Sequence, residues 1–227
     1  YFMQSYSACF FADQVLITTE YIKDFWVSYP LISATKFRVV PNWVDCDVQF
    51  KQRIYKSNIR VTPRVAWVGR LSAEKCPMLA VDLATSSGAE LVVVGQGELC
   101  DAVDALVSNL DTVTRLSFVT NSDLGRFMAG FDALLVTSVY EGNPKVILEA
   151  FAVGLNVIAI EAVGVSELVG VDRGLLISRN LDVEEMGALI SQYLKKVGAR
   201  DVHRSNARSF IEQYCKISTA IDLSFDD

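Results

Sequence analysis

The chain has 227 residues, 51% of them hydrophobic, and a formal net charge of −6. Its cations are scattered rather than gathered into a basic stripe, which excludes nucleic acid as an expected partner but leaves room for a small anionic ligand. Five widely spaced cysteines and a single histidine argue against a disulfide framework and against a metal site, and they fit a reducing, cytoplasmic compartment.

The first sixty residues contain two short apolar segments. Residues 14–18 and 36–40 are expected strands, and a helix is expected between them around 20–26. Residues 46–62 are polar and mixed in charge, which indicates a linker or a surface helix. The chain starts in what looks like the middle of a helix, so the lack of a targeting signal carries no weight.

From Arg64 onward, apolar strands alternate with helices. The expected strands are 64–68, 90–94, 115–119, 132–137, 156–160 and 174–177, and the expected helices lie near 76–86, 98–108, 122–129, 145–153 and 183–196. This alternation predicts an α/β fold with a doubly wound, Rossmann-like parallel sheet. Ligands of such sheets bind beyond the carboxyl ends of the strands, so the residues after each strand are the candidates.

A basic loop follows the strand at 64–68. Gly69 lets the chain turn there, and Arg70 and Lys75 are expected to project at the carboxyl edge of the sheet. Two cations at that edge can neutralise a diphosphate, arginine through its planar fork and lysine as a point charge. A solvated basic loop without a ligand is the alternative, and these residues alone leave both open.

A glycine-rich turn follows the strand at 90–94. Gly95 and Gly97 match the start of the dinucleotide-binding pattern G-x-G-x-x-G, but Cys100 stands at its third glycine. The strand is also the second of its domain rather than the first. NAD binding is therefore disfavoured, and we interpret the turn as one that touches a phosphate or a base.

The segment after the strand at 132–137 carries the densest set of candidates. Asn143 is a good N-cap and Pro144 suits the first helical position, so a helix is expected to begin there with its positive end at the crevice. Gly154 suits the end of that helix. Glu141 lies in the loop before it.

Glu149 lies on the same helix among apolar neighbours, where a carboxylate needs a partner. That partner is either Lys145, one turn earlier, or the vicinal hydroxyls of a ligand such as a ribose. In the second case Glu141 would meet the hydroxyls of a bound sugar. Paired carboxylates also occur in glycosidases, but a hydrolase of neutral sugars would not need the neighbouring phosphate-binding features.

Four ordered motifs resemble the C-terminal domain of the group 1 glycosyltransferases (glycosyltransferase family 4). They are VGRLSAEK (68–75), LVVVGQGEL (91–99), SVYEGNPKVILEAFAVGLNVIA (138–159) and GVSELV (164–169). The third is similar to the family's E-x7-E motif, with Glu141 and Glu149 at the matching separation. Weaker matches at 12–25 and 37–45 resemble the last elements of the family's N-terminal domain and the crossing into the second domain.

The resemblance implies the C-terminal half of a GT-B fold with a remnant of the N-terminal domain. Residues 1–50 would be the terminal elements of the acceptor domain and the interdomain crossing. Residues 51–200 would form the nucleotide-sugar-binding Rossmann-like domain, and 201–227 a C-terminal helix and tail. Most of the acceptor-binding half would then be missing from this chain.

The activity that the resemblance implies is a retaining transfer from a nucleoside-diphosphate sugar, in glycan or polysaccharide biosynthesis, with no tightly bound cofactor and no essential metal. Arg70 and Lys75 would bind the diphosphate and stabilise the departing nucleotide. Glu141 would position the donor sugar, and Glu149 would hold the ribose hydroxyls. Further donor contacts are implied for Gly69, Gly95, Val119, Thr120, Gly142, Asn143, Lys145 and Val146.

The resemblance also implies the partners. The missing N-terminal domain would select a glycan or lipid-linked acceptor, and the isolated chain would not catalyse transfer. The full-length enzyme would associate peripherally with the inner face of a membrane. Two alternatives stay open: a GT-B-fold sugar-nucleotide epimerase, which would need further acid/base residues in the cleft, and a non-catalytic nucleotide-binding module.

The chain departs from the family pattern at two places near the site. Asn143 and Pro144 replace the Phe-Gly that many members carry, and the proline removes one backbone N–H. Cys76 replaces a common glycine after the lysine. The first departure puts the detailed sugar contacts in question.

Overall fold

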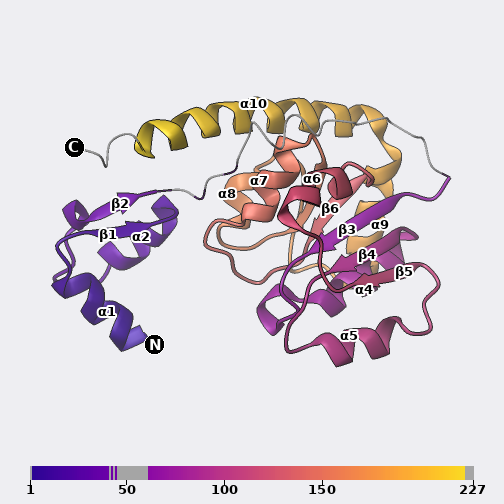
Figure 1. Ribbon diagram of the computed structural model, residues 1–227, viewed down its shortest axis with the longest axis horizontal. Coiled ribbons are helices and arrows are strands. Elements are labelled where there is room, and N and C mark those ends of the chain that lie inside the picture. Colours follow the sequence, from indigo (N-terminus) through magenta and orange to yellow (C-terminus); the bar gives the residue numbers. More distant parts are fainter. Residues whose placement is uncertain (1, 41, 43, 45–60, 223–227) are drawn as a thin grey trace.

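The structure, a computed structural model, describes residues 2–40, 42, 44 and 61–222. A small N-terminal unit precedes a larger α/β unit (Figure 1). The small unit contains α1 (Phe2–Phe11), β1 (Val15–Ile17), α2 (Glu20–Val27), the 3-10 helix η1 (Ala34–Lys36) and β2 (Phe37–Val39). Its two strands pair in parallel over a small apolar cluster. Most of the expected linker, 46–62, lies outside the described residues.

The larger unit is built on a six-stranded, all-parallel sheet with the order β5-β4-β3-β6-β7-β8. The strands are β3 (Arg64–Val68), β4 (Glu90–Val94), β5 (Val113–Leu116), β6 (Ala133–Val136), β7 (Asn156–Ile160) and β8 (Leu175–Ile177). The doubly wound α/β fold that strand–helix alternation predicts is therefore confirmed. All residues of β6 and β7 are buried, and all of them except Asn156 at the start of β7 are apolar, as is typical of central parallel strands.

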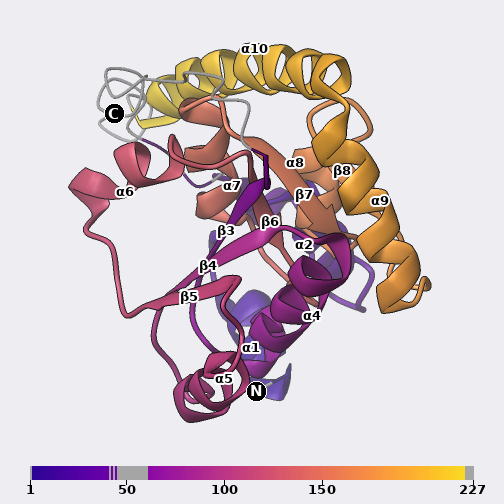
Figure 2. The ribbon, with the colours of Figure 1, turned by 90° about the vertical axis from the view of Figure 1, so that its right-hand side faces the viewer.

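Helices cover both faces of this sheet. They are α4 (Pro77–Ser87), α5 (Cys100–Val107), α6 (Asn121–Met128), α7 (Lys145–Ala152), α8 (Val165–Val169), α9 (Val183–Lys195) and α10 (Val197–Asp222), with a 3-10 turn, η2 (Ala73–Lys75), before α4. Of these helices, α4 and α9 pack together on one face, as Figure 2 shows. On the other face α10 crosses over α7.

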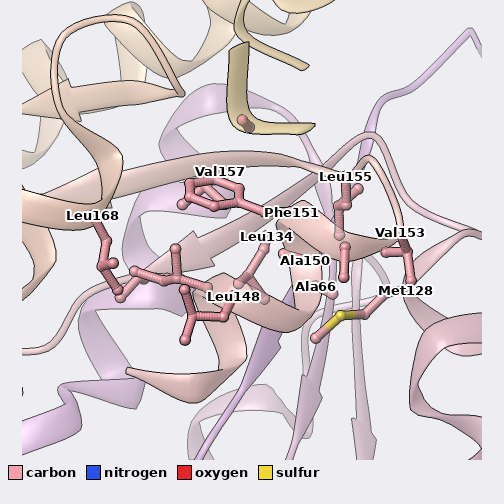
Figure 3. Packing of buried hydrophobic residues seen from close by; sticks show 14 of the residues in the cluster. Ala66, Met128, Leu134, Leu148, Ala150, Phe151, Val153, Leu155, Val157 and Leu168 are labelled. Carbon is pink, nitrogen blue, oxygen red and sulfur yellow. The ribbon is translucent and has the colours of Figure 1, made fainter. Parts of the chain in front are cut away.

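The alternation of side chains along each strand divides the core into two layers. Ala66 and Leu134 face the cluster beneath α6, α7, α8 and α10, whereas Val65 and Leu135 face the cluster beneath α4, α5 and α9. Figure 3 shows the first layer, in which the ring of Phe151 is completely buried. Burying a side chain of that size stabilises the fold by about 2 kcal/mol.

The strand order creates one place where the winding of the chain reverses. From β3 the chain moves outward to β4 and β5, and it then returns through α6 to β6, on the other side of β3. The helices that leave β3 and β6 therefore cover opposite faces of the sheet, and the loops after these two strands diverge. Ligands of doubly wound sheets bind in the crevice at this reversal.

Two details of the predicted elements are wrong. The expected strand at 115–119 begins and ends earlier, at Val113–Leu116, because its register is set by pairing with β4. The short helix α8 was not expected, since its five residues begin after Gly164, which has a left-handed backbone. The domain boundaries stay predictions: the one at 50/51 lies outside the described residues, and α10 runs through the one at 200/201.

Polar contacts join α10 to the amino ends of the central strands and to α9. The Asp132 carboxylate, just before β6, accepts the backbone N–H of Arg64 at 2.9 Å and pairs with Arg200 of α10 at 3.2 Å. On α9, the Tyr193 hydroxyl lies 3.1 Å from His203 Nδ1, and the two rings stack. These contacts lie at the sheet end opposite to the crevice. Within the described residues, no helix is long and apolar enough to cross a membrane.

The glycine-rich turn after β4 packs against the loop after β3 through its backbone. A Cβ on Gly95 would lie 1.7 Å from the carbonyl oxygen of Gly69, and a Cβ on Gly97 would lie 2.3 Å from that of Leu71. The two loops are also joined by hydrogen bonds from Leu71 N to Gln96 O and from Leu99 N to Leu71 O, both 2.9 Å. The backbone of this turn therefore fixes the position of the basic loop after β3.

Gly95→Ala is expected to destabilise the fold by roughly 3 kcal/mol in urea unfolding, because it adds a clash with backbone to an unfavourable φ of +149°. Gly198→Ala is the matched control: nothing lies within 4 Å of its Cβ and it sits in α10, where alanine favours the helix by up to about 1 kcal/mol. Equal stability of the Gly95 variant and the wild type would contradict this packing.

Candidate functional site

A cavity of about 310 Å³ opens at the reversal of winding, between the carboxyl ends of β3 and β6. It is lined by the ends of both strands, by the loops that follow them and by the start of α7. The lining residues are Trp67, Val68, Gly69, Arg70, Lys75, Leu135, Val136, Ser138, Glu141, Asn143, Pro144, Lys145 and Val146.

The cavity brings together part of the set of residues predicted from the sequence. Those that line it are Gly69, Arg70, Lys75, Glu141, Asn143, Lys145 and Val146, and those that do not are Gly95, Val119, Thr120, Gly142 and Glu149. Gly95 packs under the loop after β3, and Thr120 is the residue before α6. Most of the predicted residues that follow β3 and β6 therefore converge, except Gly142 and Glu149, whereas those that follow β4 and β5 do not line this cavity.

Lys75 and Glu141 form an ion pair across the reversal point. The lysine ends the turn after β3, and the carboxylate lies in the loop after β6. Their side chains are 24% and 11% exposed, so water screens the pair less than a surface pair. Ser138 also donates its hydroxyl to Glu141 Oε1 at 2.7 Å. The pair thus places a cation and a carboxylate side by side in the lining of the cavity.

Arg70 is placed differently from Lys75. Its side chain is 73% exposed and lies 4.0 Å from Glu74, a distance that contributes little in water. The guanidinium is therefore available at the mouth of the cavity, where it can move to meet an anion. A partly buried lysine and an exposed arginine are a suitable pair for a charged ligand that enters from solvent.

The helix α7 starts at the cavity, but its cap differs from the prediction. Pro144, with φ −69° and ψ 106°, is the N-cap, and the first helical residue is Lys145. Asn143 does not cap the helix, because its Oδ1 instead accepts the hydroxyl of Tyr214 from α10 at 3.3 Å. The positive end of α7 still faces the cavity, as expected.

The other end of α7 confirms the role predicted for Gly154. Gly154 has φ +73° and follows the C-cap residue Val153. The N–H of Leu155 binds the carbonyl of Ala150 at 2.8 Å, and that of Gly154 binds Phe151 at 3.0 Å, which makes a Schellman motif.

Glu149 is 13% exposed on α7, and its only ion pair among the described residues is the one with Lys145, at 4.0 Å. Burial raises the pKa of the Glu149 carboxyl, and the positive charge of Lys145 offsets part of that rise. The ion pair expected for the purely structural alternative is therefore present, but it is long and its lysine is half exposed. The carboxylate keeps much of its capacity to accept hydrogen bonds.

The N-terminal unit touches the loop that carries Glu141. A Cβ on Gly142 would lie 3.3 Å from the hydroxyl oxygen of Thr18 and 3.8 Å from Ile22 of α2. The Asn42 amide donates to the carbonyl oxygen of Asn143. These contacts bring the small unit against one side of the cavity wall.

Sequence reasoning missed two residues that hold this loop. Ser138 is the second residue after β6 and Arg179 the second after β8, so an inspection of every strand end would have included both. Arg179 donates from Nη2 to the carbonyl of Ser138 at 2.5 Å and from Nε to that of Glu161 at 3.1 Å. It also lines a second cavity, of about 450 Å³, together with Tyr21 of α2. Within the described residues, no group of three or more His, Cys, Asp or Glu side chains could hold a metal ion.

Comparisons with known proteins agree on one family and one fold. Residues 62–196 match the profile of the family described as glycosyl transferases group 1. An uncharacterized glycosyltransferase of Methanocaldococcus jannaschii is 24% identical over 184 residues, which cover 74% of this chain and 46% of that protein. The chain thus spans about half the length of this relative.

Two solved structures share the fold. A mutant of TarM from S. aureus, solved with fondaparinux, α-GlcNAc-glycerol and UDP, superposes with a TM-score of 0.81 at 18% identity, over 98% of this chain and 45% of TarM. HepE from Anabaena, solved with UDP-glucose, gives a TM-score of 0.79 at 21% identity, over 96% of this chain and 65% of HepE.

Glu149→Gln is expected to raise the melting temperature at pH 7 by roughly 1–4 °C, measured by calorimetry. The pKa of Glu149 is higher in the folded protein than its ordinary 4.5, so ionisation of this group costs stability as the pH rises through the folded-state pKa. The gain should therefore disappear as the pH falls below 4.5. Glu184→Gln, at an exposed carboxylate in the first turn of α9, is the control and should give no gain. A Glu149 variant that melts at or below the wild-type temperature at pH 7 would contradict this account.

Proposed function

Since the chain belongs to the group 1 glycosyl transferases, we propose that it binds a nucleoside-diphosphate sugar in the cavity between β3 and β6, as the donor half of a retaining glycosyltransferase. The observation that carries this proposal is the convergence of Arg70, Lys75, Glu141 and the start of α7 at the reversal of winding. These groups supply positive charge for a diphosphate and a carboxylate for hydroxyl groups.

The diphosphate binds between the basic loop and α7. Lys75 supplies a positive charge held by its ion pair, Arg70 an exposed planar fork, and α7 the positive end of its dipole. Pro144 at the cap has no N–H, so this end of the helix offers one backbone donor fewer. Diphosphate binding replaces part of the attraction that Glu141 exerts on Lys75 in the empty cavity.

The two motif carboxylates take different parts of the donor. Glu141 lines the cavity and accepts hydrogen bonds from the sugar, which places the reacting carbon near the leaving diphosphate. Glu149 lies outside the cavity lining, one turn along α7, and holds the ribose hydroxyls. A diol is a suitable partner for a buried carboxylate whose ion pair is long.

In the reaction, the bond from the anomeric carbon to the diphosphate oxygen breaks, and its electron pair stays on the nucleotide. The acceptor oxygen forms the new bond on the same face, and its proton passes to the leaving phosphate oxygen. Lys75 and Arg70 stabilise the charge that develops on the diphosphate, the kind of electrostatic term that is usually the largest in such steps.

The remainder of the relatives' length would supply the acceptor side. TarM was solved with α-GlcNAc-glycerol and HepE with UDP-glucose, which supports a sugar nucleotide as donor and a glycan as acceptor, in glycan or polysaccharide biosynthesis. On this proposal the isolated chain binds the donor but does not transfer its sugar. The full-length enzyme acts in the cytoplasm on glycan or lipid-linked acceptors at the inner face of a membrane.

Lys75→Ala is expected to weaken binding of the matching nucleotide at least tenfold and to lower the transfer rate of the full-length enzyme about 100-fold or more, because it removes the fixed charge beside the diphosphate. Calorimetric titration of this chain and of the full-length protein with UDP, GDP and ADP measures the first effect. Product formation measures the second.

The controls separate binding from folding. Lys195→Ala removes an exposed lysine at the end of α9 and should bind like the wild type. The double variant Lys75→Ala, Glu141→Gln leaves no unpaired carboxylate and should also bind weakly. Binding of none of the three nucleotides by the full-length wild type, or unchanged turnover of Lys75→Ala, would contradict the proposed function.

A further inference from the structure

The buried hydroxyl of Thr137, the residue after β6, forms hydrogen bonds with the turn that carries Lys75. Its side chain is completely buried, and Oγ1 accepts the indole N–H of Trp67 at 3.0 Å. Oγ1 also lies 2.8 Å from the carbonyl oxygen of Lys75 and 2.9 Å from that of Cys76. A hydroxyl has a single proton, so the two carbonyl oxygens share that proton. The oxygen of the hydroxyl accepts the indole N–H through a lone pair.

The turn that this hydroxyl contacts has an unfavourable backbone. Cys76 has φ +49° and ψ +55°, a left-handed conformation that costs a residue with a Cβ about 1–2 kcal/mol. The turn must therefore be held by its surroundings. Apart from Thr137, the contact that joins it to the loop after β6 through the backbone is the hydrogen bond from Val139 N to Glu74 O, at 2.8 Å.

The two residues that directly follow β6 thus hold the two sides of the Lys75–Glu141 pair. Thr137 fixes the backbone carbonyl of Lys75, and Ser138 fixes the carboxylate of Glu141. The side chain of Thr137 does not line the cavity, so it cannot contact a ligand there directly. Its effect on the cavity has to pass through the direction in which Lys75 points.

We propose that Thr137 is a positioning residue, whose buried hydroxyl aims Lys75 into the cavity by holding the left-handed turn at Cys76. A glycine at position 76 would adopt the left-handed conformation without strain, but Cys76 does not. The Thr137 hydroxyl, which accepts the Trp67 indole N–H, therefore restrains the backbone of this turn. The inference concerns the orientation of Lys75 in the empty protein, and only its consequence for ligand binding rests on the proposed function.

The test compares Thr137→Val, which keeps the shape and removes the hydroxyl, with Thr137→Ser, which keeps the hydroxyl. In the full-length protein without nucleotide, trace acetylation followed by mass spectrometry reports how often Lys75 leaves its ion pair, normalised to the exposed Lys195 of the same sample. The valine variant should label Lys75 roughly fivefold faster, as expected for the loss of one hydrogen bond, and the serine variant within about twofold of the wild type. A role only in packing would not produce this difference.

Two outcomes would overturn the proposal: wild-type labelling of Lys75 in Thr137→Val, or equally fast labelling in the serine and valine variants. If the valine variant does not fold, the double variant Trp67→Phe, Thr137→Val is used, because it also removes the indole N–H that valine would leave unpaired. The same expected and contradicting results apply to it.

A nucleotide titration measures how strongly the orientation of Lys75 affects ligand affinity. With whichever of UDP, GDP and ADP the wild type binds, Thr137→Val should bind about fivefold more weakly and Thr137→Ser normally. Wild-type affinity in the valine variant would show that the orientation of Lys75 does not matter for the ligand. A wild type that binds none of them would contradict the proposed function and leave the labelling result standing.

Discussion

The ion pair between Lys75 and Glu141 joins two loops that diverge from the middle of a parallel sheet. Both loops would otherwise be free to separate, because the helices that follow them cover opposite faces. Three contacts close the gap: the pair itself, the backbone bond from Val139 to Glu74, and the Thr137 hydroxyl beneath the turn. The shape of the cavity, and the charge inside it, depend on this closure.

The same region carries the features that cost stability. Cys76 has a left-handed backbone without being glycine, and the Glu149 carboxyl is largely shielded from water while its ion pair with Lys145 is long. Features that lower the stability of the fold are expected at functional sites, where the geometry of the site matters more than maximal stability. The core beneath them shows no such compromise: β6 and β7 are buried along their whole length, and α7 ends in a complete Schellman motif.

The sequence alone predicted the fold class and the position of most strands, because runs of apolar residues can be recognised locally. It also predicted the convergence of Lys75 and Glu141, because both follow strands and the carboxyl ends of parallel strands lie at the same edge of the sheet. It placed the start of α7 one residue too early, since the competing partner of Asn143, Tyr214, lies about seventy residues away. The donor contact expected of Gly95 stays a prediction, and the structure adds that this residue packs against the backbone of another loop. It missed Thr137, whose importance depends on Trp67 and Cys76 meeting it in space. For Asn143 and Thr137 a long-range contact decided the role of a residue whose local pattern was ambiguous.

The most direct test of the site is hydrogen exchange with mass spectrometry on the full-length protein, with and without whichever of UDP, GDP and ADP gives protection. A donor site between β3 and β6 predicts slower exchange in the loop after β3, residues 69–75, and from the loop after β6 into α7, residues 141–149. No change is expected around the second cavity, at 161–180. Protection confined to 161–180, or no protection by any nucleotide, would contradict a donor site between β3 and β6.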